Sequence, residues 1–175
     1  MSDVRLPWVA VHKGNVVARE LADGHYTRQT PGHPMWARPG YNFVLLAHYE
    51  NGAALYCWWR PKWEDGRPGT QRKDGLRVIE CTMFRRVGET DQASDLIHAA
   101  VNSLRSDAAR AALHLDKAGM IEQLLTGVSS KKTARGRSKK HKAGYCYRMA
   151  GWTELVKRTG RADVWLTYPW SNPWH

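Results

Sequence analysis

Chemically capable side chains gather in a short run near the end of the chain, from Gly144 to Trp152. The run contains Tyr145, Cys146 and Tyr147, and it follows a segment, residues 131–142, that holds seven Lys or Arg and no acid. A tyrosine hydroxyl can protonate a leaving group or hydrogen-bond a substrate. The two tyrosines lie two apart on a helical turn, so one of them should face the core. A tyrosine-bearing turn beside a basic segment indicates an enzyme that acts on a polyanion.

The positive charge of the chain is concentrated in that segment. Subtracting its seven cations from the net charge of +11 leaves +4. A compact basic run can neutralise several phosphates and release their counterions, although its alternative role is a solvated loop that serves solubility. Phosphate contacts position a protein on nucleic acid but do not read its sequence. We expect double-stranded DNA to be the partner, contacted through Lys131, Lys132, Arg135, Arg137, Lys139, Lys140 and Lys142.

A second group of cations is interleaved with tryptophans beside two loops rich in Pro and Gly, residues 27–40 and 61–75. Aromatic rings stack on bases while cations meet the backbone, so this mixture suits a nucleic-acid groove. A Trp-rich core is the alternative, and for Trp58 or Trp59 taken singly it is the commoner one. Neighbouring strand residues face opposite ways, so one of these two should point away from the core. The further candidate contacts are Arg28, Trp36, Arg38, Arg60 and Lys62.

Three more residues are candidates for catalysis. Glu80, at the end of an expected strand, is either a general base for an amine proton or the partner of an arginine such as Arg85. His25 is a candidate base or metal ligand, although a single histidine after a helix is more often structural. Ser94 lies where a helix should begin, a position more typical of a cap than of a nucleophile. The sequence contains no phosphate-binding loop, dinucleotide fingerprint or clustered zinc-ligand spacing.

Length and composition limit the class of protein. A chain of 175 residues with 42% hydrophobic residues is expected to form a single domain, residues 1–175, with a core of its own. No stretch approaches the ~18 apolar residues of a membrane span, and we expect no membrane partner and a cytoplasmic location. The three cysteines, Cys57, Cys81 and Cys146, are far apart and odd in number. We expect reduced, mostly buried thiols, with a thiolate nucleophile at Cys146 as the alternative.

Apolar periodicity and turn signals predict the order of elements. Asn15 should cap the first helix, which ends near Gly24, and Asn51-Gly52 should join a hairpin. Thr90 or Asp91 should cap the helix that contains Leu96 and Leu104. The expected strands are 8–11, 41–49, 53–59, 76–84, 121–128, 152–158 and 163–168, with a turn over 85–91, helical segments over 107–118 and 143–150, and the last two strands joined through 159–161.

This order predicts an α/β (α+β) fold, with a mixed, mostly antiparallel central sheet and helices on both of its faces. The aromatic tail, residues 168–175, either stacks on a base or partner or folds over the sheet. The sequence leaves a monomer and a homodimer both open.

The order of elements resembles that of the Gcn5-related acetyltransferases. The likeness rests on Glu80 to Gly88, on the helix near Ser94, and on the turn from Tyr147 to Trp152. It implies that Arg85, Arg86 and Gly88 belong to a loop that binds an acyl-CoA-like donor at a helix N-terminus. Here that loop has one glycine and two acids. Carboxylates would repel a pyrophosphate, so the departure argues against ordinary acetyl-CoA binding.

A narrower resemblance is to Mom-type DNA-modification proteins, phage proteins of the same superfamily. It covers about residues 15–170 and rests on short motifs at 25–28, 80–85, 93–97 and 144–147. The resemblance implies an enzyme, acting in a bacterial host cell, that converts adenine to an N6-carbamoylmethyl form and so protects DNA from restriction. It implies a functional centre drawn from His25, Tyr26, Glu80, Ser94 and Tyr145, joined by Tyr147. An iron, with His25 as a candidate ligand, is also an implication of the resemblance.

Two alternatives stay open. One is an N-acetyltransferase of the same superfamily that uses acetyl-CoA on RNA, protein or a small amine. The other is a non-catalytic nucleic-acid-binding protein on a degenerate acetyltransferase scaffold. The resemblance also predicts an aspartate shortly after the strand 121–128, where this chain has Ser129 and Ser130.

Overall fold

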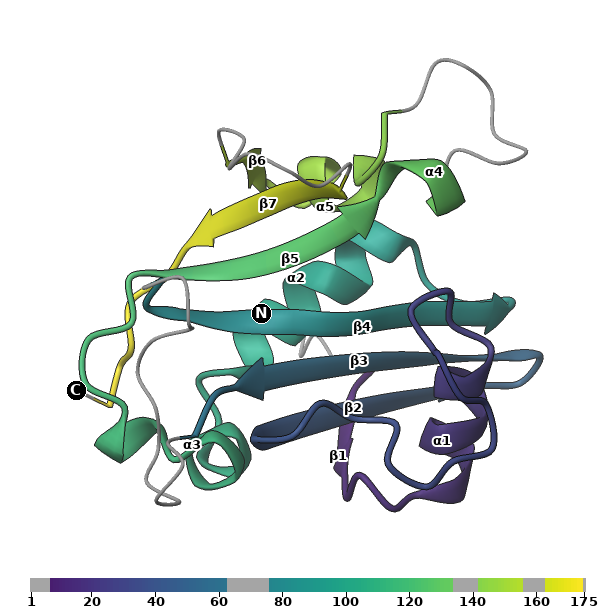
Figure 1. Cartoon of the computed structure of the whole chain (residues 1–175), viewed down its shortest axis with the longest axis horizontal. Coiled ribbons are helices and arrows are strands. Elements are labelled where there is room, and N and C mark those ends of the chain that lie inside the picture. The colour runs from purple at the N-terminus through teal and green to yellow at the C-terminus, as the bar shows by residue number, and fades with distance from the viewer. Residues whose placement is uncertain (1–6, 63–75, 134–141, 156–162, 175) are drawn as a thin grey trace, which may run out of the picture.

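A computed structural model describes residues 7–62, 76–133, 142–155 and 163–174. They form a seven-stranded sheet in the order β1-β2-β3-β4-β5-β7-β6, in which only the β4–β5 pair is parallel (Figure 1). The strands are β1 (Val9–Val11), β2 (Tyr41–Tyr49), β3 (Gly52–Arg60), β4 (Val78–Gly88), β5 (Gln123–Ser129), β6 (Thr153–Glu154) and β7 (Asp163–Pro169). The predicted mixed, mostly antiparallel sheet is confirmed.

Helices cover both faces of the sheet, as predicted (Figure 1). One face carries α1 (Val16–Asp23), and the other carries α2 (Ala93–Ser103) and α3 (Asp107–Leu113). Strand alternation separates two cores: Leu55 packs with α1, whereas its neighbour Tyr56 packs with α2. The remaining helical segments are the 3₁₀ turn η1 (Leu115–Lys117), α4 (Ser130–Thr133) and α5 (Tyr145–Met149).

The first helix and the hairpin follow their sequence signals. The Asn15 side chain accepts a hydrogen bond from the Ala18 amide at 3.0 Å, and Gly24 is the C-cap of α1. The pairing of Tyr49 with Gly52 places the hairpin turn where Asn51-Gly52 predicts it. Both features can be predicted from the sequence, because a capping side chain and the residues of a turn interact only with residues up to four positions away.

Strand β4 is longer than predicted. The expected turn over 85–91 begins only after Gly88, because β4 stays paired with β3 as far as Gly52. Gly88 has φ +66°, and a Cβ there would collide with the Asn51 carbonyl oxygen. Gln92, rather than Thr90 or Asp91, is the N-cap of α2, and it makes no side-chain capping bond.

The aromatic tail folds back on the protein. Trp170 is buried, the Asn172 amide donates to the Leu115 carbonyl at 2.8 Å, and Arg110 lies 4.7 Å from the ring centroid of Trp174. These contacts favour the second of the two roles left open for residues 168–175. The predicted strand 152–158 is observed only as β6, and residues 156–162, with the turn 159–161, lie outside the described residues.

The parallel pairing of β4 with β5 is short. It joins Val78–Cys81 to Gln123–Thr126, after which β4 remains paired with β3 and β5 with β7. At the same point β4 contains an extra residue: Cys57 pairs with Met83 and Trp58 with Cys81, so Thr82 forms a bulge. A bulge bends its strand and re-aims its side chains, so β4 and β5 separate here. The space between the separated strands is a candidate location for a functional site.

A buried arginine fixes the end of α3. Arg60 is 1% exposed and donates to the carbonyls of Leu113 and His114 at 2.6 and 2.8 Å. The substitution Arg60→Met should lower the free energy of unfolding by about 2–4 kcal/mol, because both carbonyls lose their donor. Urea unfolding followed by tryptophan fluorescence measures this. The exposed Arg105→Met should change it by less than about 0.5 kcal/mol, and an equally small effect of Arg60→Met would contradict the prediction.

Candidate active site between strands β4 and β5

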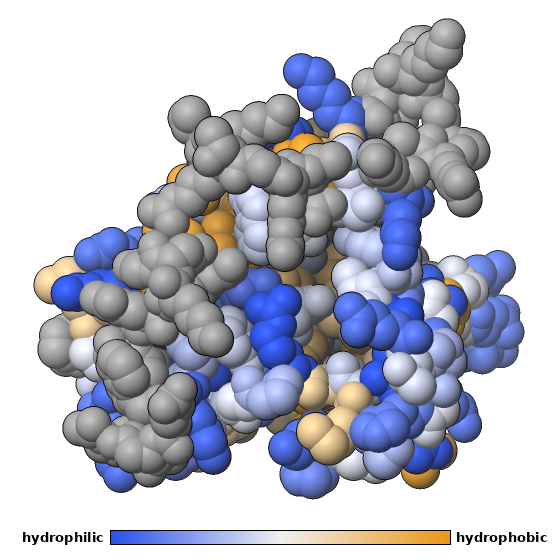
Figure 2. All heavy atoms as spheres, in the orientation of Figure 1, coloured by the Kyte–Doolittle hydropathy of each residue, from blue (hydrophilic) through white to orange (hydrophobic). Residues whose placement is uncertain are grey.

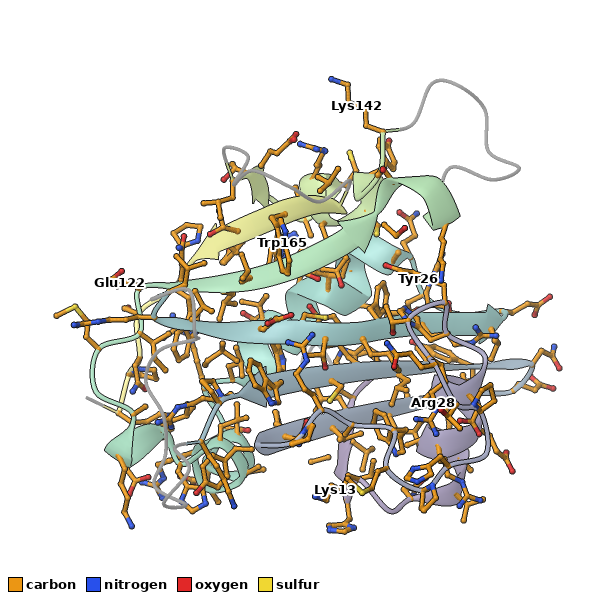
Figure 3. All side chains as sticks on the ribbon, viewed as in Figure 1. Lys13, Tyr26, Arg28, Glu122, Lys142 and Trp165 are labelled. Atoms are coloured by element: carbon orange, nitrogen blue, oxygen red, sulfur yellow. The ribbon has the colours of Figure 1, made fainter. Side chains whose placement is uncertain are left out.

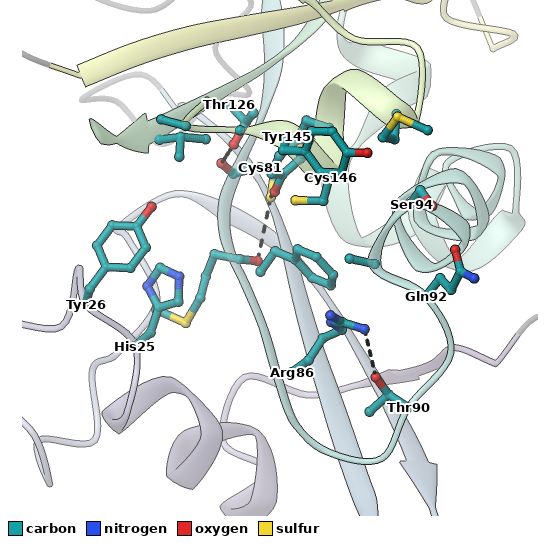
Figure 4. A pocket seen from close by; sticks show the side chains of 18 of the residues that line it. His25, Tyr26, Cys81, Arg86, Thr90, Gln92, Ser94, Thr126, Tyr145 and Cys146 are labelled. Atoms are coloured by element: carbon teal, nitrogen blue, oxygen red, sulfur yellow. Dashed lines mark hydrogen bonds between the residues drawn. The ribbon is translucent and has the colours of Figure 1, made fainter. Parts of the chain in front are cut away.

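A cavity of about 800 Å³ lies where β4 and β5 separate. Its lining includes His25 and Tyr26, which follow α1, and Ser94 and Cys146, which belong to α2 and α5. In Figure 4 these two groups stand on opposite sides of the hollow. Because α1 and α2 cover different faces, the cavity extends through the sheet. Residues from both faces of the sheet therefore line one cavity.

On the α1 side, His25 is held as a neutral imidazole. Its Nδ1 lies 2.7 Å from the Thr27 hydroxyl and accepts from the Thr27 amide, and its ring stacks on Tyr26 at 4.3 Å. Burial, followed by the charge of Arg85, lowers the pKa of His25 to about 4; Lys132 adds to this and a hydrogen bond with the Phe84 backbone opposes it. A group with that pKa is a weak base at neutral pH, so its chemistry is hydrogen bonding.

On the other side, α5 presents both tyrosines to the cavity. Tyr145 is 43% exposed and Tyr147 is 5% exposed, which confirms that one of the pair faces the core. The Tyr147 hydroxyl lies 3.2 Å from the Cys81 sulfur, and burial raises the pKa of Tyr147 well above its usual value. Tyr147 is therefore protonated, as a hydrogen-bond donor in the cavity must be.

The thiols are mostly buried, as predicted. Cys57 and Cys81 are buried and Cys146 is half-buried. Burial raises the pKa of Cys57 to about 12 and that of Cys81 to about 11, so neither is a thiolate at neutral pH. Cys81 contributes to the cavity as the thiol beside Tyr147, a role that sequence reasoning missed. The Thr126 hydroxyl, also missed, donates to the Cys81 carbonyl at 3.2 Å and ties β5 to β4.

The N-terminus of α2 opens on the cavity. Ser94 lines it and is not the helix cap, and Gly88 and Arg86 line it as well. The Arg86 guanidinium donates to the Asp91 carbonyl at 2.8 Å and so fixes the turn that precedes α2. Backbone amides in the first turn of a helix favour anionic groups. Of the three predicted cofactor contacts, Arg86 and Gly88 are at the cavity and Arg85 is not.

The two acids of that turn are bound to the β2–β3 hairpin. The Asn51 amide donates to the Glu89 carboxylate at 3.2 Å, and the Tyr49 hydroxyl donates to the Asp91 carboxylate at 2.8 Å. From the sequence, both carboxylates are expected to repel a bound pyrophosphate. The hairpin fixes both through neutral donors, and Glu89 lines the cavity, so the expected repulsion remains.

Glu80 does not face the cavity. Its side chain is 3% exposed and pairs with Arg38 at 2.9 Å, outside the lining residues. Cys81, the next residue, lines the cavity, and alternate strand residues point to opposite faces. Glu80, predicted as a general base beside the pocket, therefore lies outside the cavity lining, and its arginine partner is Arg38 rather than Arg85. The sequence alone does not say which of two neighbouring strand residues faces the cavity, because that depends on how the strand is paired.

Three of the predicted nucleic-acid contacts are structural instead. Trp36 is buried and its indole donates to the Lys13 carbonyl at 2.7 Å. Arg28 pairs with Asp23 at 2.7 Å and also donates to the carbonyls of Met35 and His33. Arg60 lies in the core. A buried cation or indole needs an internal partner, so none of these side chains can meet a phosphate or a base.

Other predicted contacts are exposed. Lys62 is exposed, and Arg38 lies 4.8 Å from the Trp59 ring centroid with 46% of its side chain exposed. Lys132 is exposed on α4 and donates to the Tyr26 carbonyl at 2.9 Å. Lys142 lines the cavity and projects outward, while Tyr26 lies between α4 and β4 (Figure 3). Arg135, Arg137, Lys139, Lys140 and the Lys131 side chain lie outside the described residues.

The residues beside His25 do not fit a resident iron. Within the part of the chain that the structure describes, no three His, Cys, Asp or Glu side chains converge on a metal position. The Nδ1 of His25 is already occupied by Thr27. A histidine that is not part of such a group among the described residues does not make an iron site.

Comparison of the chain with known protein families, with curated proteins and with solved structures finds no match. The function therefore has to be inferred from the cavity and the charges around it. Among the described residues, no helix has both the length and the apolar character needed to cross a membrane.

The buried His25 should make stability depend on pH. Its pKa falls from 6.5 in the unfolded chain to about 4 in the folded protein, so the unfolded state binds more protons between these values. Stability should be present above pH 6.5 and be lost as pH falls toward 4, by roughly 3 kcal/mol. Urea unfolding at pH 7 and pH 4 compares the wild type with His25→Gln, which should lose less. Equal losses in the two proteins would contradict the buried neutral imidazole.

Proposed function

We propose that this protein is a group-transfer enzyme that modifies a base in double-stranded DNA, with adenine N6 as the acceptor. The observation that carries the proposal is the cavity that passes through the sheet, with hydroxyl donors inside and cations at its rim. A transfer reaction needs two substrates to meet at one point, and a cavity lined from both faces of the sheet gives each substrate a side of its own. The resemblance to Mom-type proteins supports the choice of acceptor.

The α1 side suits the nucleic acid. A base inside a duplex must leave the stack before an enzyme can reach it, and its pocket needs a stacking surface. The stacked rings of His25 and Tyr26 provide an aromatic surface at the cavity wall. Lys132 lies on this side, where its ammonium donates to the Tyr26 carbonyl, and Lys142 lines the cavity next to α5; both suit flanking phosphates. Figure 2 shows that hydrophilic residues predominate on this face outside the grey atoms.

The α2 side suits an acyl-CoA-like donor. The first-turn amides of α2, with Gly88 and Arg86, would hold its phosphates. Arg86 offers such a group a cation, whereas Glu89, which the Asn51 amide holds, also lines the cavity. When bound, the donor supplies the activated group that is transferred. The identity of the transferred group has to be determined from the modified product.

The side chains of the cavity have separable roles in this proposal. Tyr147, kept protonated by burial, donates to the group that departs or to the oxygen on which negative charge develops. The half-exposed Tyr145 and Ser94 contact the two substrates from the α2 side. His25, neutral at pH 7, orients the exocyclic amine by a hydrogen bond. Cys81 positions the Tyr147 hydroxyl.

A second candidate is an N-acetyltransferase that takes acetyl-CoA and another amine. The opening at α2, with its acids held by the hairpin, favours this candidate as much as the first, because both require the same donor side. The two candidate functions differ in the acceptor substrate. The basic rim of the cavity favours a polyanionic acceptor over a small amine. A non-catalytic binding protein would have no use for a cavity through the sheet.

Nucleoside mass spectrometry of plasmid DNA from expressing cells tests the proposal. DNA from cells with the wild-type protein should contain a new adenosine-derived species, and its mass identifies the transferred group. Tyr147→Phe should lower its yield about 100-fold or more, because the donor hydroxyl is lost while the ring remains.

The matched control is Arg105→Met, which removes an exposed cation beyond the end of α2 and should leave the yield unchanged. Unaltered DNA, with the protein expressed and folded, would refute DNA modification. Saturable binding of acetyl-CoA in that case would identify the acetyltransferase instead.

A further inference from the structure

Arg85 occupies an unusual position on the α1 side of β4. Its guanidinium lies directly against Gly24, at the end of α1, where a Cβ would collide with it. The glycine therefore leaves room for the arginine beside His25. The Nε atom of Arg85 is buried and has no hydrogen-bond partner. A buried donor without a partner costs free energy, so the site is incomplete as it stands.

Carboxylates do not neutralise Arg85 within the described residues. Asp23, the acid nearest to Gly24 in the sequence, is already bound to Arg28 at 2.7 Å and to the Gly32 amide at 2.9 Å. An unpaired guanidinium in a half-buried position is uncommon, because desolvation of the charge has to be compensated. An anion from outside the chain would provide that compensation.

Lys132 brings a second cation to the same place from a distant part of the sequence. Its ammonium donates to the Tyr26 carbonyl at 2.9 Å, and the Tyr26 ring stacks on His25. Arg85 and Lys132 both lower the pKa of His25, and no carboxylate of the described residues offsets them. Their charges therefore both act on His25, which lines the cavity on the α1 side.

We propose that Arg85 and Lys132 form a phosphate-binding site beside His25, which takes a DNA phosphodiester next to the nucleotide in the cavity. Guanidinium binds phosphate oxygens through two parallel hydrogen bonds, and a flexible ammonium adds a second charge. The site rests on the proposed function for its ligand and goes beyond it by naming the residues that hold the strand. None of the residues that line the α2 opening takes part.

The DNA backbone is a better ligand here than the phosphates of a small donor. Lys132 lies on α4 and belongs to the basic segment 131–142, so a nucleic-acid strand held by Lys132 lies at this position. The phosphates of a donor have their own place at the first turn of α2, on the opposite face. The two kinds of phosphate are therefore separated by the sheet.

Nuclear magnetic resonance of the His25 imidazole tests the site without any assay of activity. His25→Gln assigns the signal. In the wild type, saturation with a short duplex should raise the pKa of His25, because a phosphate stabilises the imidazolium form. Arg85→Met should raise the pKa in the free protein, since one cation is removed, and should reduce the further rise on adding DNA.

Salt dependence of duplex binding gives an independent readout. Arg85→Met and the exposed Lys132→Gln should each reduce the slope of log affinity against log salt by about one, the loss of one phosphate contact. Arg105→Met, a matched removal of a distant cation, should leave the slope unchanged. Lys132 lies on the surface, so its variant keeps the test valid if Arg85→Met does not fold.

Wild-type slopes in both variants, or a pKa of His25 that duplex DNA does not raise, would overturn the site. A rise produced by inorganic phosphate but not by the duplex would replace the DNA strand with a small phosphate ligand and so refute the proposed source. If plasmid DNA is not modified but duplex DNA still raises the pKa of His25 and the variants still reduce the salt dependence, the proposed chemistry is refuted and the phosphate site is supported.

Discussion

The short parallel pairing between β4 and β5 is the constraint on which the site depends. Four residues of each strand pair, and the bulge at Thr82 then turns β4 away. Each strand retains its other neighbour after they separate, so the sheet stays intact on both sides of the opening. The two strands stop pairing where the segment after α1 and the helices α2 and α5 bring their side chains together.

Burial then determines which groups in the opening carry charge. Tyr147 and Cys81 stay protonated and His25 stays neutral, because each would lose solvation if it ionised. The cations Lys132 and Lys142, in contrast, remain exposed at the rim. The wall formed by these three side chains is therefore uncharged, and exposed cations lie at the rim, an arrangement that attracts a polyanion and admits a neutral base.

Sequence predicted the elements wherever local chemistry determines them. The Asn15 cap, the Asn51-Gly52 turn and the alternation along the strands all act over a few residues, so they can be recognised without the fold. Tyr145 and Tyr147, which precede the turn at Gly151, line the cavity and remain predicted site residues.

The failures concern side chains whose partners come from distant segments. Glu80 and Arg38 lie 42 positions apart in the chain, and Arg60 reaches carbonyls more than 50 positions away. Which face a strand residue occupies depends on register, and a single bulge at Thr82 changes it. No local sequence pattern indicates that β4 and β5 separate or that a cavity forms between them. For this reason Cys81 and Thr126 were not predicted as cavity residues.

The most direct test of the passage through the sheet uses the thiol already present at its wall. Cys146 is half-buried at the cavity, whereas Cys57 and Cys81 are buried thiols with raised pKa values, so alkylation at pH 8 should label Cys146 first. Saturating duplex DNA, or a donor analogue such as desulfo-CoA, should each slow this labelling several-fold, because both substrates enter the same cavity. An alkylation rate unchanged by bound DNA and by the analogue would contradict a shared cavity.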